Sequence, residues 1–347
     1  MYDSDVSTVR TALQESNPTV FSNATINQIL ALTTRQNDPT VTFTSAAPDA
    51  NGNVTVTAGA EVVLIASSDT QQTIVNPPAN APVVIFQGKG GVNATINDAA
   101  ATVPSGDQSH VDRIVVGSAG NDRIVVQDAK NTQIILGSGD STVITGHGVD
   151  TVQAGLGNSS IIGGSGDYAV VKLAGAPTNY QVAVNNGHAI VTDQTTHKTT
   201  DISKIQYVQL DNGNALIFAK NSVEAAVSTL YHTAFGRDAE ARGLDFWFDL
   251  GRAGATLKQI ADGFTHSAEF APQAALTNND FVQGLYQHTF GRAGETSGIT
   301  YWTDALAHGA TRADLIASFS QIASQNIAGE IHTEKVEGDT IIITGIV

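Results

Sequence analysis

Residues 112–171 read DRIVVGSAGN, DRIVVQDAKN, TQIILGSGDS, TVITGHGVD, TVQAGLGNS and SIIGGSGDY, followed by AVV. The repeat is ten residues long three times and then nine residues long three times. Each unit joins a short β-branched run to a turn rich in Gly, Asn, Asp or Ser. This period fits one strand plus one tight turn and is too short for a helix pair or a propeller blade. The stretch therefore predicts a right-handed parallel β-solenoid in which the units stack.

Three turns carry a more specific pattern. GSAGNDRIV at residues 117–125 and GHGVDTVQ at residues 146–153 resemble the haemolysin-type (RTX) nonapeptide G-G-x-G-x-D-x-U-x, where U is a large aliphatic residue. GGSGDYAVV at residues 163–171 shares the glycines but places Asp167 one position early. The resemblance implies the β-roll of a secreted bacterial protein. In that family the turn glycines adopt left-handed backbone, and turn aspartates and carbonyls hold calcium.

In a roll, successive turns fall on opposite edges, so partners on one edge are two repeats apart. One edge then carries Asp112, Asn131, Asp150 and Tyr168, and the other carries Asp122, Ser141 beside Asp140, and Ser159. On the resemblance, the candidate metal ligands are Asp112, Asp122, Asp140 and Asp150, and calcium is the expected cofactor. Neither edge offers an unbroken aspartate ladder. The alternative is a solenoid held by aliphatic stacking and amide or hydroxyl ladders, with little metal.

Composition restricts the class of protein. The 347 residues include 33 acidic and 17 basic side chains, for a formal net charge of −16, which argues against nucleic acid or an anionic membrane as the main partner. The absence of cysteine excludes disulfides, thiolate zinc sites and cysteine nucleophiles. No run approaches the ~18 apolar residues that a membrane-spanning helix needs, so we expect no membrane insertion.

The sequence divides into five regions. We expect a helical N-terminal cap over the open end of the solenoid (residues 1–40), the solenoid (41–173), a β-hairpin cap (174–220), a tandem helical domain (221–330) and a C-terminal tail (331–347). In the first region, short amphipathic helices between Val6 and Leu32 end at Asn17-Pro18 and Asp38-Pro39. Strand-like runs then centre near Val56, Leu64, Ile74, Val84, Ile96 and Ile114. Asn185-Asn186-Gly187 and Asp211-Asn212-Gly213 predict hairpin turns.

The C-terminal third is duplicated. VSTLYHTAFGR from Val227 and VQGLYQHTFGR from Val282 align at an offset of 55, as do Trp247 with Trp302. The tandem pattern resembles a helical domain of unknown function that is common in bacterial surface-layer and RTX-type exported proteins, which implies surface association or assembly. Both tryptophans are most simply core residues. Arg237 and Arg292 have two interpretations: each binds an acidic glycan or partner, or each satisfies helix carbonyls or a local acid.

The two ends bear on export. The N-terminus lacks a basic start and a continuous apolar core, so it does not predict a Sec signal peptide. GDTIIITGIV from Gly338 looks like the terminal signal of type I secretion substrates. Taken alone, this tail fits a final β-strand equally well.

The sequence shows no familiar catalytic motif. HExxH, GxSxG and the Rossmann fingerprint are absent, and the nine histidines are scattered. We therefore expect a noncatalytic, secreted cell-surface or extracellular-matrix protein of the surface-layer or biofilm type that self-assembles, with calcium contributing. Its expected partners are copies of itself, cell-surface polysaccharide and the type I secretion machinery. The alternatives are a polysaccharide-binding adhesin and a glycan-active β-helix enzyme with paired carboxylates on a solenoid face.

Overall fold

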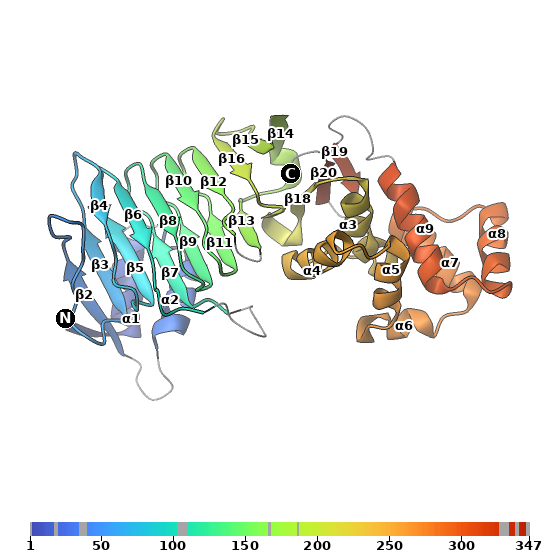
Figure 1. The fold of residues 1–347 in the computed structure, drawn as a ribbon, viewed down its shortest axis with the longest axis horizontal. Coiled ribbons are helices and arrows are strands. Elements are labelled where there is room, and N and C mark those ends of the chain that lie inside the picture. Colours follow the sequence, from blue (N-terminus) through green and yellow to red (C-terminus); the bar gives the residue numbers. More distant parts are fainter. Residues whose placement is uncertain are drawn as a thin grey trace. The chain divides into compact units, whose positions relative to one another are not determined.

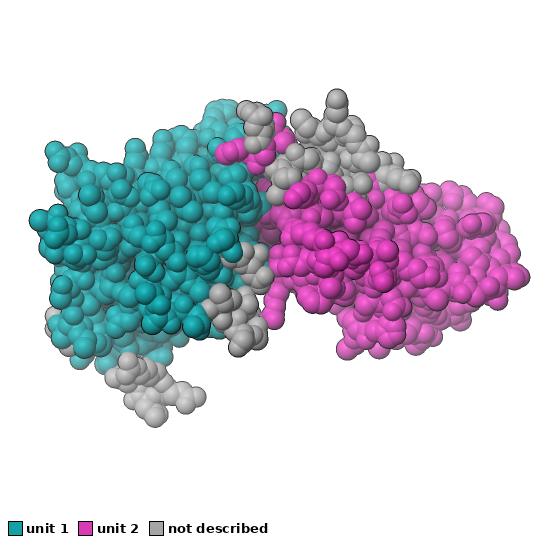
Figure 2. All heavy atoms as spheres, viewed as in Figure 1, with its two compact units in different colours: residues 1–173, 180–183, 189–205 teal, residues 174–179, 184–188, 206–347 magenta. Residues whose placement is uncertain are grey.

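The computed structural model describes residues 2–16, 20–34, 40–102, 110–165, 168–185, 187–325, 333–336 and 340–344 (Figure 1). The chain forms two compact units, coloured separately in Figure 2. Unit 1 comprises residues 1–173, 180–183 and 189–205, and unit 2 comprises residues 174–179, 184–188 and 206–347. Among the described residues, no helix is long and apolar enough to cross a membrane.

Unit 1 is built on two largely parallel sheets. From β3 to β13 the strands alternate, with odd-numbered strands in the first sheet and even-numbered strands in the second. The first sheet runs in the order β1 (Tyr2–Asp5), β2 (Thr40–Ala46), β3 (Val62–Ala66), β5 (Val83–Gln87), β7 (Arg113–Val116), β9 (Thr132–Ile135), β11 (Asp150–Gln153), β13 (Ala169–Lys172). The second runs β4 (Thr73–Val75), β6 (Val92–Ile96), β8 (Arg123–Val126), β10 (Ser141–Ile144), β12 (Ser159–Ile162), β16 (Thr199–Ser203), β15 (His188–Asp193), β14 (Tyr180–Asn185).

The strand register follows the sequence repeat. Arg113 is level with Thr132, nineteen residues later, and Ser141 is level with Ser159, eighteen residues later. The second step equals two nine-residue repeats, and the first is one residue short of two ten-residue repeats. The parallel pairing of alternate units is as the sequence predicts. The β-branched runs form the strands because they pack well on a pleated surface, and the Gly-rich segments between them turn.

The N-terminal helices cover a sheet face. α1 (Val6–Ser16) and α2 (Asn23–Thr33) share one buried cluster with strand residues of the first sheet. The members from the two helices and from β5, β7 and β9 are Val9, Leu13, Ile26, Ile29, Leu30, Val83, Ile85, Ile114, Val116 and Ile135. The cluster also includes Val41, Phe43 and Val62, so the helices cover this sheet from β2 to β9. With the helices on this face, β7 and β9 bury their residues on both sides, whereas β10 and β12 alternate buried with half-buried residues.

Two other features depart from the sequence prediction. The strand expected near Val56 is reduced to an isolated bridge between Asn53 and Asn76. The parallel pairing also continues past residue 173, because β16 pairs with β12 with Ser159 level with Thr200. Several residues named in the sequence predictions lie outside the described residues: 17, 18, 38, 39, 167, 186, 338, 339 and 345–347.

Unit 2 joins a small set of strands to a helical bundle. β17 (Tyr207–Gln209) and β18 (Ala215–Ala219) form the antiparallel hairpin predicted at Asp211-Asn212-Gly213. The last described segment forms β20 (Thr340–Thr344), parallel to β18 and antiparallel to β19 (Thr333–Val336). The alternative interpretation of the tail as a final strand is thus observed.

The helices of unit 2 follow the duplication. They are α3 (Ser222–Phe235), α4 (Ala241–Arg252), α5 (Leu257–Thr265), α6 (Ala271–Ala274), α7 (Asn278–Phe290), α8 (Thr296–Ala307) and α9 (Arg312–Gln325), with a 3-10 turn η3 (Ala268–Phe270). Gly236 and Gly291 end α3 and α7 in left-handed conformation, which costs glycine little. Thr256 and Gln259 form the capping box expected at the start of α5.

Candidate functional site: carboxylates between the turns

Asp122 fastens two neighbouring strands of the second sheet. Its Oδ2 accepts a hydrogen bond from the Ser118 backbone N–H (2.7 Å), and its Oδ1 accepts from the Ser118 hydroxyl (2.6 Å). Oδ1 also accepts from the Val92 N–H (3.0 Å), which belongs to β6. The side chain is buried, and burial raises its pKa although the three hydrogen bonds oppose that shift. Asp122 therefore links its own turn to a strand thirty residues earlier.

Asp150 does the same in the first sheet. Its Oδ1 accepts from the Thr132 N–H (2.8 Å) and its Oδ2 from the Gly146 N–H (2.6 Å). The residue is 0% exposed, and loss of hydration raises its pKa to about 7. The repeat predicts Asp150 level with Tyr168, but the pairing of β11 with β13 sets it level with Ala169.

The other two predicted ligands lie nearer the solvent. Asp112 accepts from the Asn131 N–H (2.9 Å) and contacts His110 Nε2 (3.0 Å). Asp140 accepts from the backbone and side-chain nitrogens of Asn158 at 2.8 and 3.2 Å, and these bonds lower its pKa. Each of the four predicted ligands accepts a hydrogen bond from the neighbouring unit of its own sheet, and Asp122 and Asp150 also accept within their own turn.

The predicted ligands do not converge on one point. Asp112 precedes β7 and Asp150 begins β11 in the first sheet, whereas Asp122 and Asp140 precede β8 and β10 in the second. In the part of the chain that the structure describes, no three acidic or histidine side chains form a group able to hold a metal ion. An ionised carboxylate has about four lone-pair sites, so Asp150 keeps acceptor capacity beyond its two hydrogen bonds. Calcium ligation at these residues stays a prediction.

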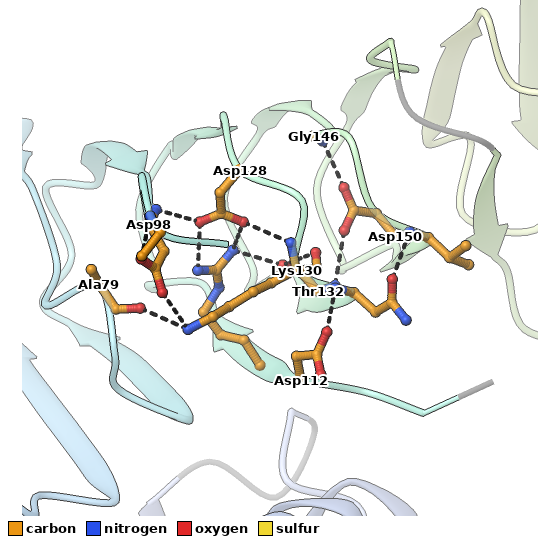
Figure 3. A network of polar contacts seen from close by, with 12 residues as sticks. Ala79, Asp98, Asp112, Asp128, Lys130, Thr132, Gly146 and Asp150 are labelled. Carbon is orange, nitrogen blue, oxygen red and sulfur yellow. Dashed lines mark hydrogen bonds and ion pairs between the residues drawn. The ribbon is translucent and has the colours of Figure 1, made fainter. Parts of the chain in front are cut away.

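Sequence reasoning missed a buried ion pair beside Asp150 (Figure 3). Arg113 Nη1 and Nη2 donate to Asp128 Oδ2 (2.9 Å) and Oδ1 (2.8 Å), and Nη2 also donates to Thr132 Oγ1 (2.8 Å). The side chains of Arg113 and Asp128 are 1% and 0% exposed. Such a bidentate pair is geometrically specific and depends on both partners being present.

The same network extends outward through a lysine (Figure 3). Asp128 also accepts from the backbone N–H groups of Asp98 (2.7 Å) and Lys130 (3.1 Å). Lys130 Nζ then contacts Asp98 Oδ2 (2.8 Å) and the Ala79 carbonyl (3.1 Å). The hydrogen bond from Lys130 lowers the pKa of Asp98. The network joins four segments of the stack, and its chemistry is structural: each carboxylate is engaged with amides or cations.

Strand parity explains why the sequence did not reveal Arg113. DRIVV occurs at residues 112–116 and again at 122–126, so Arg113 and Arg123 look equivalent. In β8, however, Ile124 and Val126 are buried and Arg123 is exposed, while in β7 all four residues are buried. A shift of one residue exchanges the two faces of a strand, and that shift depends on pairing rather than on the motif.

The helical repeats separate two interpretations that the sequence left open. Arg237 donates from Nε to Glu269 Oε1 (2.6 Å) and from Nη2 to Glu269 Oε2 (2.8 Å). This agrees with the interpretation in which the arginine pairs with a local acid. Trp247 and Trp302 are half-buried and lie 4.9 and 5.3 Å from Phe264 and Phe319, measured between ring centroids. Their neighbours Phe246 and Tyr301 are 56% and 66% exposed, which the sequence argument did not foresee.

Comparison with known proteins bears on the helical region. Residues 218–274 and 261–327 each match the family described as a domain of unknown function (DUF4214). No curated protein and no solved structure matches the chain. The helical third of this chain is thus similar to two consecutive copies of a domain whose function is unknown.

Proposed function

We propose that this chain is a noncatalytic protein of the bacterial cell surface or extracellular matrix that assembles with copies of itself. In this proposal it is exported by the type I machinery, and unit 1 is a parallel β-solenoid. The alternation of strands between two sheets and the two-repeat register support the solenoid. The hydrogen-bonded carboxylates then link neighbouring coils of the solenoid.

One observation carries the assembly: β4, the last strand of the second sheet, exposes an aliphatic side chain, while residues 52–54 bond to Asn76 on its outer side. β4 pairs with β6, and its central residue Ile74 is 62% exposed. An exposed aliphatic side chain at the end of a sheet favours contact with the apolar surface of another chain. At the same end of the first sheet, β1 carries Asp3 and Asp5, charges of the kind that discourage pairing. The second sheet therefore offers the better contact.

The C-terminal strand β20 has a partner strand on each side. Ile341, Ile342 and Ile343 pair with β18 on one side and with β19 on the other. We therefore place the contact at β4. Calcium would strengthen it by screening the net charge of −16 between protomers.

The test of this proposal is the size of the full-length protein in solution. Light scattering and negative-stain microscopy should show multimers that grow with protein concentration and with calcium. Because contact between an end of one protomer and a different surface of the next does not close, we expect filaments or sheets rather than a dimer. A protein that stays monomeric at high concentration with calcium present would contradict the proposal.

A second candidate function is polysaccharide binding by the helical unit. Phe246 and Tyr301 occupy equivalent positions in the two copies, and both are exposed. Each packs edge-on against the adjacent tryptophan, with centroids 4.8 and 5.0 Å apart. Exposed, supported aromatic rings suit the flat apolar face of a sugar. Binding of a glycan by the full chain, lost in Phe246→Ala/Tyr301→Ala, would support this candidate.

A further inference from the structure

The two helical copies hold an arginine in the same way on one side of its guanidinium. Arg237 Nη1 donates to the Asp238 carbonyl (2.9 Å) and contacts Glu240 Oε2 (3.2 Å). Arg292 Nη1 donates to the Ala293 carbonyl (3.2 Å) and to Glu295 Oε1 (2.7 Å). These acceptors are equivalent at the offset of 55.

The aromatic support beneath the two arginines is also equivalent. The guanidinium carbon of Arg237 lies 5.0 Å from the ring centre of Tyr231, and that of Arg292 lies 5.6 Å from the ring centre of Tyr286. Cation–π contacts of this length fix the plane of the guanidinium. Both arginines are therefore positioned before any further partner arrives.

The opposite edge of the guanidinium differs between the copies. In the first copy, Nε and Nη2 of Arg237 hold both oxygens of Glu269, and this pairing lowers the pKa of the glutamate. In the second copy, Nε and Nη2 of Arg292 donate to no acceptor among the described residues. The Arg292 side chain is 51% exposed, against 36% for Arg237.

The missing carboxylate has a cause in the local fold. α5 ends at Thr265, and Ser267 caps the short turn η3 that carries Glu269. α9 has no such break and continues to Gln325, which keeps Ser324, the counterpart of Glu269, on the helix. Ser324 is buried and donates to the Gln321 carbonyl (3.0 Å). The second copy thus keeps the positioned arginine without its carboxylate.

We propose that the Nε–Nη2 edge of Arg292 binds a carboxylate of an acidic polysaccharide. The Arg237–Glu269 pair shows the geometry: two parallel N–H···O bonds, which lysine cannot provide. The choice of a polysaccharide as the ligand rests on the second candidate function, polysaccharide binding. Tyr301 supplies the reason to favour a sugar over an acidic peptide, because its exposed ring lies on α8, which starts beside Glu295. Six residues separate Tyr301 from Glu295, a rise of about 9 Å along the helix axis.

A single exposed pair of this kind binds weakly, so repeated carboxylates on one polymer should be needed for retention. The probe is polygalacturonate, and its matched control is the same polymer as the methyl ester, which keeps the rings and removes the charge. Binding of the full-length protein to each immobilised polymer is measured at low salt. Wild type should prefer the acid form.

Four variants locate the site. Arg292→Gln should weaken binding to polygalacturonate about tenfold, the loss typical of a charge-assisted hydrogen-bonded pair. Arg237→Gln removes the same charge from an edge that Glu269 already fills, so it should bind like wild type. Glu269→Ala should strengthen binding, because it opens the second edge. Asp304→Asn makes an equal change in charge on the exposed face of α8, and it should not strengthen binding.

Each contrary result has a distinct meaning. Equal binding by wild type and a folded Arg292→Gln overturns the site while leaving polysaccharide binding in place. Equal gains from Glu269→Ala and Asp304→Asn reduce the effect to net charge and also overturn it. Failure of wild type to bind either polymer overturns both the site and the second candidate function. Arg292-dependent binding of poly-glutamate, with no binding of polygalacturonate, would overturn the choice of a sugar.

Discussion

Two arginines in the same five-residue motif differ in what they do for stability. Arg113 is buried with both oxygens of Asp128, and Arg123 is exposed. Arg113→Met should cost about 3–5 kcal/mol of unfolding free energy, because it leaves Asp128 as a buried unpaired charge. Arg123→Met should change stability by no more than about 0.5 kcal/mol. Urea denaturation measures both, and the double variant Arg113→Met/Asp128→Leu should recover much of the loss. Similar costs for the two single variants would contradict the buried pair.

Asp150 should make stability depend on pH near neutrality. Its pKa is about 7 in the folded chain against an ordinary value of 3.8, so the folded state binds a proton that the unfolded state releases. The free energy of unfolding should therefore fall as pH rises from about 4 to about 7 and should level off above that. Asp150→Asn should flatten that slope, although it also removes the acceptor for the Gly146 N–H. Thermal melts of wild type and Asp150→Asn in the presence of a chelator across this pH range measure the effect. If the two proteins show the same change of stability with pH, Asp150 is ionised throughout.

Calcium binding is best tested as a difference. If the turn aspartates bind calcium, a concentration of one hundred times the dissociation constant should add about 2.7 kcal/mol to the unfolding free energy. Asp122→Ala will lower the melting temperature in any case, because three donors lose their acceptor. The informative quantity is the calcium-dependent rise, which should shrink in Asp122→Ala and in Asp150→Ala. If calcium does not raise the melting temperature of wild type, amide hydrogen bonds and aliphatic packing alone stabilise the stack.

At the scale of elements, the turn glycines are required by stacking. A Cβ on Gly137 would overlap the carbonyl oxygen of Ser118, and one on Gly155 would overlap that of Gly137. Because both obstacles are backbone, Gly137→Ala should destabilise by at least about 2 kcal/mol. Gly284→Ala is the control: it lies inside α7 with nothing within 4 Å of the new methyl, so it should stabilise by about 0.5–1 kcal/mol. Chemical denaturation of the two variants should give opposite signs, and a neutral Gly137→Ala would show that the coils can separate.

The elements that sequence could predict are those whose determinants are local. The period of nine or ten residues fixed one strand per unit and the two-repeat pairing step, and Asp211-Asn212-Gly213 gave the hairpin between β17 and β18. The position of α1 and α2 was not predictable, because the sequence does not show which face of the first sheet is apolar and needs a cover. The same limit applied to the site: the aspartates were visible, whereas Arg113 and the open edge of Arg292 depend on strand parity and on where α5 ends.

For the whole molecule, assembly should depend on the end of the second sheet. Ile74→Lys places a charge on β4, a change that disfavours burial of this side chain against another chain. It should convert the calcium-dependent multimers to monomer in light scattering without lowering the melting temperature, because Ile74 is mostly exposed. Leu156→Lys is the matched control, since Leu156 is 60% exposed in a turn between β11 and β12 rather than on an edge strand. If any exposed apolar surface could support assembly, both variants would break up the multimers to the same extent. Multimers that survive Ile74→Lys but not Leu156→Lys would move the contact from the end of the stack to its side, where a filament would grow by lateral rather than end-on addition.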